Sequence, residues 1–193
     1  LAAFYGRVEA AGEWPSALSE SLVAMLPKGG TRELEDRRPI VLLSVVYRLW
    51  GALRASLFGR WLEEAGILPA PGPGRAADAQ AYEAALEFEL ARAKGEPVAG
   101  LALDWSKCYD RLPLALVGRF GRIVGVPERL LRPMLAAYGQ PRRVLVDGMV
   151  GKPRRPVCGL APGCPAATHW VALVMAPWLF RARRVAEAAR ARA

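Results

Sequence analysis

The feature that most constrains this fold is residues 157–180, a run that contains no Asp, Glu, Lys or Arg. A membrane-spanning helix needs about 20 apolar residues, so the run is long enough to be considered as one. Prolines and glycines interrupt it at Gly159, Pro162, Gly163, Pro165 and Pro177. Because proline disrupts helical hydrogen bonding, we expect a continuous helix only over residues 166–176. We therefore expect a buried helix and no membrane segment, with a membrane-anchored protein as the alternative.

The composition is that of a folded chain with a basic surface. Its 193 residues are 53% hydrophobic, which suits one medium domain or two small ones. The net charge of +9 favours a polyanionic partner such as nucleic acid. Most of the basic residues are arginines, whose planar guanidinium suits phosphate and base edges. A GC-rich gene would give the same arginine bias, so both explanations stay open.

Cysteine and histidine are scarce. Cys108, Cys158 and Cys164 lack the close paired spacing of a zinc site, and His169 is the only histidine. The N-terminus lacks the basic and apolar regions of a signal peptide. We therefore expect reduced thiols and an intracellular protein, nuclear or cytoplasmic and not secreted. The sequence predicts no oligomeric state.

In the first part of the chain, apolar patterning predicts two strands and a long helix. Residues 21–27 and 38–44 are short β-rich runs with a charged turn between them, which indicates a strand pair. Apolar residues then recur at steps of three and four, which predicts a helix capped by Ser44 and ended by Gly66. A segment rich in Pro and Gly, residues 68–78, separates this part from the rest.

The second part mixes helices and strands without regular alternation. The expected elements are a helix over residues 76–94, a strand over 98–103, helices over 114–123 and 127–139, and a hairpin over 142–151. Pro133 should bend or shorten its helix, and Asp147 with Gly148 favours a tight hairpin turn. This order is typical of an α+β fold rather than a doubly wound sheet. We expect two parts, residues 1–74 and 75–193.

The stretch "LALDWSKCYD", residues 101–110, places two carboxylates behind an apolar run. Asp104 and Asp110 are six residues apart, so on a helix they would point in different directions and are not expected to bind one metal side by side. We expect Asp104 to face a cleft from the end of a strand, and Asp110 to cap the helix that begins near Pro113. An ordinary loop-edge aspartate is the alternative for Asp104.

This stretch resembles the first catalytic-carboxylate motif of reverse transcriptases of the non-LTR retrotransposon and group II intron type. Further stretches are similar to that family's motifs in the right order. They are "VAMLPKGG" and "EDRRPIVLLSVVYRLW" for the fingers, "PGPGRAADA" for the segment between fingers and palm, and "CGLAPGCPAATHW" before the long palm helix. The resemblance covers roughly residues 22–180. It implies a right-hand polymerase, with the fingers part in residues 1–74 and the fingers-to-palm segment and a partial palm in residues 75–193.

The resemblance implies an RNA-directed DNA polymerase that transfers dNTPs to a primer 3′-hydroxyl with two Mg²⁺ ions, or Mn²⁺ in their place. Asp104 would be a catalytic metal ligand, joined by the backbone carbonyl of Trp105. The other implied dNTP-binding residues are Lys28, Arg38, Trp105, Tyr109, Gly159 and Gly163. Lys28 and Arg38 would meet the triphosphate, and Tyr109 would exclude a 2′-hydroxyl. The alternatives are solvated surface cations and a tyrosine packed in the core.

Basic segments suggest where nucleic acid would lie. Arg142, Arg143, Arg154 and Arg155 are the candidate contacts to the backbone of an RNA template or of a DNA or RNA primer. An ordinary solvated surface is the alternative for these arginines.

Two departures from the family pattern argue against an active polymerase in this chain. Pro162 stands where the family usually has Gln, and no aspartate follows Phe180, where a paired-aspartate motif is expected. The chain also begins without Met, so we expect a piece of a longer protein. Because the paired aspartates are missing, we expect this piece to be inactive alone. The alternative is a degenerate, non-catalytic remnant that binds nucleic acid.

Overall fold

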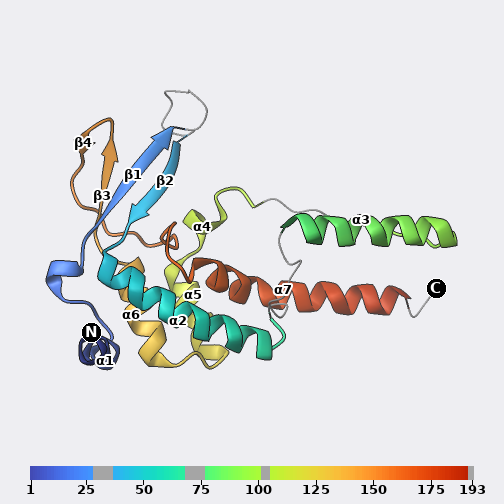
Figure 1. The fold of residues 1–193 in the computed structure, drawn as a ribbon, viewed down its shortest axis with the longest axis horizontal. Coiled ribbons are helices and arrows are strands. Elements are labelled where there is room, and N and C mark those ends of the chain that lie inside the picture. The colour runs from blue at the N-terminus through green and yellow to red at the C-terminus, as the bar shows by residue number, and fades with distance from the viewer. Residues whose placement is uncertain (28–36, 68–76, 101–104, 191–193) are drawn as a thin grey trace. The chain divides into compact units, whose positions relative to one another are not determined.

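A computed structural model describes residues 1–27, 37–67, 77–100 and 105–190 of the chain (Figure 1). The chain divides into two compact units, one formed by Leu1–Leu68 with Lys107–Ala193 and the other by Pro69–Ser106. The described residues form helices and one mixed sheet, so the predicted α+β class is confirmed.

The sheet of the first unit joins the two predicted strand pairs. Strands β1 (Ser21–Pro27) and β2 (Arg37–Leu42) are antiparallel, and β3 (Arg142–Val146) and β4 (Met149–Val150) form the predicted hairpin. Strand β3 also pairs with β1 in parallel, which gives the order β2-β1-β3-β4. The hairpin turn has φ of 49° at Asp147 and 83° at Gly148, as a type I′ turn requires.

Helices lie below and beside this sheet in the view of Figure 1. They are α1 (Ala2–Ala11), the short 3₁₀ helix η1 (Ser16–Leu18), α2 (Val45–Glu64), α4 (Cys108–Arg111), α5 (Leu114–Ile123), α6 (Glu128–Tyr138) and α7 (Ala167–Arg190). The Ser44 cap is confirmed, because its Oγ accepts a hydrogen bond from the Tyr47 N–H at 3.1 Å. Trp50, Tyr138 and Trp170 are fully buried and join α2, α6 and α7 in one core.

Two helices run through prolines that the sequence predicted would limit them. Helix α7 continues past Pro177 to Arg190, whereas an end at residue 176 was expected. Pro177 is exposed, and the residues that follow it are mostly alanine and arginine, which are strong helix formers. Helix α6 likewise continues through Pro133 to Tyr138. Among the described helices, none is long and apolar enough to cross a membrane.

The second unit contains the predicted helix α3 (Ala77–Lys94). It ends at Gly95, which has φ of 68°, and the Glu96 N–H donates back to the Ala91 carbonyl at 2.9 Å. The strand predicted over residues 98–103 is wrong over residues 98–100, which have no regular structure, and residues 101–103 lie outside the described range. A short apolar run becomes a strand only where a partner strand accepts its hydrogen bonds.

Candidate functional site

Three segments that are far apart in the sequence meet around residues 158–164. The Leu160 N–H donates to the Tyr109 carbonyl at 2.8 Å, and the Gly159 N–H donates to the Leu112 carbonyl at 2.8 Å. On another side, the Val41 N–H donates to the Pro162 carbonyl at 3.2 Å. Strand β2, helix α4 and the segment before α7 are therefore held together by backbone hydrogen bonds.

Gly159 and Gly163 lie in the segment where these backbones meet. Both have positive φ, 97° and 98°, a conformation that side chains disfavour. A Cβ at Gly159 would lie 3.1 Å from the carbonyl oxygen of Asp110, and one at Gly163 would lie 3.5 Å from that of Val41. The close approach at Gly159 therefore involves the protein's own backbone, where the sequence suggested a nucleotide, whereas the distance at Gly163 is that of an ordinary contact.

The predicted catalytic residues are described only in part. Tyr109 is half-buried in α4 and packs against the core of the first unit. Trp105 belongs to the second unit, and 53% of the residue is exposed. Asp104 and Lys28 lie outside the described residues.

Asp110 does not cap helix α5, so that prediction is wrong. Pro113 is the N-cap residue of α5, and no side chain caps that helix. Asp110 instead lies within the short helix α4, which places it before the capping position. Burial raises the pKa of the Asp110 carboxyl, against the opposing attraction of Lys107 and Arg142.

Arg142 is directed into the protein, although the sequence suggested a contact to nucleic acid. Its Nη2 donates to the Tyr138 carbonyl at 2.8 Å and to the Gly159 carbonyl at 3.2 Å. Burial lowers the pKa of the Arg142 guanidinium, and the charge of Asp110 opposes this shift. Arg142 thus ties the end of α6 to the segment before α7, next to Asp110.

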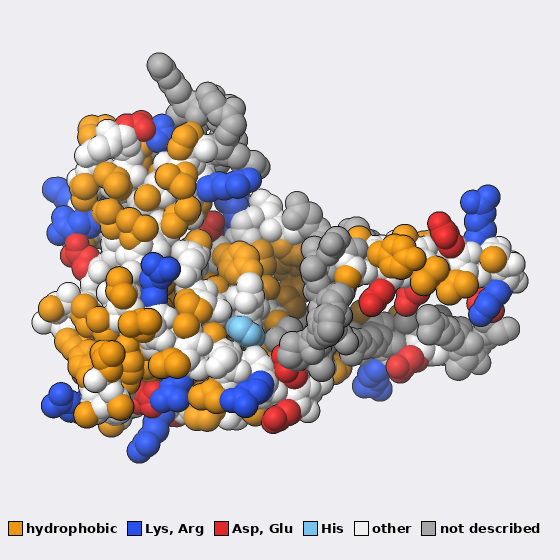
Figure 2. All heavy atoms as spheres, in the orientation of Figure 1, with side chains coloured by type: hydrophobic (Ala, Val, Ile, Leu, Met, Phe, Trp, Pro, Cys, Tyr) orange, Lys and Arg blue, Asp and Glu red, His pale blue; other side chains and the backbone are white. Residues whose placement is uncertain are grey.

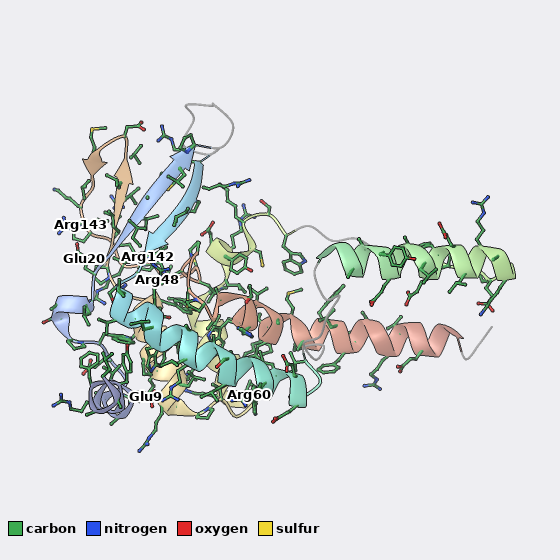
Figure 3. All side chains as sticks on the ribbon, in the orientation of Figure 1. Glu9, Glu20, Arg48, Arg60, Arg142 and Arg143 are labelled. Carbon is green, nitrogen blue, oxygen red and sulfur yellow. The ribbon has the colours of Figure 1, made fainter. Side chains whose placement is uncertain are left out.

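The other predicted nucleic-acid contacts lie nearer the surface. Arg143, beside Arg142 at the start of β3, forms an ion pair with Glu20 (Figure 3). Arg154 is exposed, and its backbone pairs with that of Arg142 through two hydrogen bonds of 2.9 and 2.8 Å. Arg155 is exposed as well.

Two neighbouring arginines on β2 have different environments. Arg37 is held by Asp147 through a bidentate ion pair, with Nη1–Oδ1 and Nη2–Oδ2 distances of 2.8 and 2.9 Å. This contact raises the pKa of the Arg37 guanidinium. Arg38 is exposed, and the two-residue alternation of a strand places it on the same face as Ile40 and Leu42. Figure 2 shows that apolar side chains gather over the sheet.

A buried polar cluster behind the site was not predicted from the sequence. The Tyr138 hydroxyl donates to Cys164 Sγ at 3.1 Å, and the Tyr47 hydroxyl also lies 3.1 Å from that sulfur. Burial raises the pKa of both tyrosines well above the usual value. Tyr47 lies in the motif "EDRRPIVLLSVVYRLW" and Cys164 in "CGLAPGCPAATHW", so these two residues could have been singled out from the sequence. No local pattern connects Tyr138 to them.

A two-metal centre needs several hard oxygen ligands held close together. Among the described residues, no group of three or more His, Cys, Asp or Glu side chains is placed to hold a metal ion. Asp104, the predicted ligand, lies outside this range, and Trp105 would contribute only a backbone carbonyl. The described residues therefore do not make a two-metal centre by themselves.

Comparison with protein-family models and with curated proteins gives no match for this chain. The assignment of a function therefore depends on the residues themselves and on how the fold arranges them.

Proposed function

We propose that this chain is the fingers and partial palm of an RNA-directed DNA polymerase of the non-LTR retrotransposon and group II intron type. The complete enzyme would use an RNA template, a DNA or RNA primer and dNTPs. Two Mg²⁺ ions, or Mn²⁺, would supply Lewis-acid chemistry when bound. Asp104 would hold one of them, assisted by the Trp105 carbonyl.

The meeting of β2, α4 and residues 158–164 is the observation that carries this proposal. These segments contain three of the motifs that resemble those of reverse transcriptases, and 67 positions separate Val41 from Cys108, the first residue of α4. Their backbones are hydrogen-bonded to one another through Tyr109 and Pro162. Unrelated sequence matches would not be expected to meet in one place.

Each residue of the proposed site has a role that its surroundings allow. Arg38 is exposed and unhindered by the ion pair that holds Arg37, so it can bind the triphosphate of a dNTP, together with Lys28. Tyr109, which is half-buried, provides an aromatic ring that excludes a 2′-hydroxyl. Arg142 positions the Gly159 segment and does not contact the substrate.

A degenerate remnant that binds nucleic acid without catalysis is the second candidate. Pro162 favours it, because proline lacks the amide side chain that the family usually places there. The coding sequence downstream separates the two candidates. An in-frame aromatic-x-Asp-Asp motif supports a polymerase, whereas a frameshift before such a motif supports the remnant.

Primer extension by the full-length parent protein tests the polymerase proposal. Replacing Asp104 with Asn should reduce extension to background, because the amide is a poor ligand for Mg²⁺ compared with a carboxylate. Glu96→Gln is the matched control, since Glu96 is an exposed carboxylate in the same unit. Extension that survives Asp104→Asn would reject the assignment of Asp104.

For the 193-residue chain alone, we expect no incorporation of dNTPs, because one carboxylate cannot hold two metal ions. Incorporation of a labelled dNTP that EDTA abolishes would show that the ligands have been assigned incorrectly.

A further inference from the structure

A polar cavity of about 610 Å³ lies beside the C-terminal ends of α1 and α6. The segment between β4 and α7 also contributes to its lining. Its lining includes Glu13, Ser16, Gly139, Gln140 and Arg155. The volume is within the range of roughly 300–1,000 Å³ found for small-ligand sites. It also greatly exceeds the space of about 30 Å³ that one water molecule occupies. The cavity therefore has room for a group the size of a nucleobase.

Gln140 is the buried polar group of this cavity. Only 6% of the residue is exposed, and it forms part of the wall of the cavity. Its backbone position is set by its neighbours, because Gly139 ends α6 and the Pro141 carbonyl accepts the Ser21 N–H at 3.0 Å. Because Gln140 lines the cavity, its amide can offer a donor and an acceptor to a ligand with a complementary edge.

Glu13 and Arg155 bring opposite charges to the same cavity. Neither forms an ion pair among the described residues, so they do not neutralise each other. The cavity thus offers a carboxylate that accepts hydrogen bonds and a guanidinium that donates them. A fitting ligand has donors on one edge and acceptors on another.

We propose that this cavity binds a guanine base of a single-stranded nucleic acid. Guanine donates from N1–H and its N2 amino group, which suits the Glu13 carboxylate, and accepts at O6 and N7, which suits Arg155. Adenine lacks the N1–H donor and the O6 acceptor. The Gln140 amide supplies both a donor and an acceptor to the same base.

Single-stranded nucleic acid is the favoured source of the base, because its unpaired bases expose these edges. Lys152 and Arg154, exposed close to Arg155 in the chain, are available for the flanking phosphates. This inference does not rest on the polymerase proposal. Of the five named cavity residues, only Arg155 was also a candidate contact to the nucleic-acid backbone, and here it is assigned to the base.

Fluorescence anisotropy on the 193-residue chain tests the site. The probes are two labelled oligouridines, one with a single central guanosine and one with a central adenosine. We expect the guanosine oligomer to bind at least about tenfold more tightly, within the range for one bidentate contact. Glu13→Gln should remove this preference, and Arg155→Gln should reduce it.

Glu64→Gln and Arg60→Gln are the matched controls, because both residues are exposed in α2 and neither lines the cavity. They should keep the preference, with circular dichroism confirming that all four variants are folded. Equal binding of the two oligomers by the unmodified chain would overturn the proposal. Retention of the preference in both Glu13→Gln and Arg155→Gln would overturn it as well.

Competition with GMP separates the two sources of guanine. We expect GMP to displace the oligomer only at concentrations far above those at which the unlabelled oligomer does so. Displacement at equal concentrations would overturn the assignment to nucleic acid and identify a free guanine nucleotide as the ligand.

Discussion

His169 is the only histidine of the chain, and it lies half-buried in α7. Its Nδ1 is buried and has no hydrogen-bond partner among the described residues. The ring centroid lies 6.0 Å from that of Phe58 in α2. Burial lowers the pKa of His169 below its usual value of 6.5, while the charge of Glu63 opposes the shift. Protonation is therefore less favourable in the folded chain than in the unfolded one.

This shift predicts a pH dependence of stability. Because the folded pKa is lowered, the stability that neutral His169 allows is present above pH 6.5 and is lost as the pH falls through the folded pKa. Urea unfolding should give a lower free energy of unfolding at pH 5.5 than at pH 7.5. The decrease should be smaller in His169→Gln. An equal decrease in both proteins would contradict a lowered pKa for His169.

At the scale of elements, small residues decide how closely the helices pack. A Cβ at Gly121 in α5 would lie 2.9 Å from Leu131 Cδ1 and 3.3 Å from Trp170 Cζ3, and both of those side chains are fully buried. Gly6 in α1 has no such neighbour within 4 Å. The same substitution should therefore have opposite effects at the two positions.

We expect Gly121→Ala to lower the free energy of unfolding by about 1–3 kcal/mol, because an added methyl group overpacks the core. Gly6→Ala should raise it by about 0.5–1 kcal/mol, because alanine favours a helix more than glycine does. Chemical denaturation of the two variants measures both changes. Stabilisation by Gly121→Ala would mean that α5, α6 and α7 are packed less closely than described.

Local signals in the sequence predicted local structure well. The Ser44 cap, the Asp147-Gly148 turn and the ends of α2 and α3 depend on residues a few positions apart, so they could be recognised. The pairing of β3 with β1 and the inward direction of Arg142 depend on contacts between distant segments. No pattern within either segment specifies such contacts. The sequence thus singled out segments that the fold brings together, but it did not indicate which of their side chains face outward.

At the scale of the whole molecule, the net charge of +9 predicts salt-dependent binding of nucleic acid. Arg142 is used internally and Arg143 is paired with Glu20, whereas Arg154 and Arg155 are exposed. Two to four phosphate contacts on a single strand correspond to a slope of about −1.4 to −2.8 in log K against log salt concentration.

Replacing Arg154 with Gln should make this slope shallower by about 0.7, because one phosphate contact is lost. Arg7→Gln is the matched control, because it removes one charge from an exposed residue of α1. It should leave the slope unchanged. Anisotropy titrations with labelled RNA at several KCl concentrations measure both slopes. A slope that does not respond to Arg154→Gln would place the phosphates elsewhere on the surface.

Pro162 takes part in the site through its backbone, because its carbonyl accepts the Val41 N–H. Every amino acid has a backbone carbonyl, so this hydrogen bond between β2 and the segment before α7 does not depend on the side chain at residue 162. The side chain at this position can therefore change without loss of the hydrogen bond from Val41. We therefore expect Pro162→Gln to keep the hydrogen bond between the Val41 N–H and the carbonyl of residue 162.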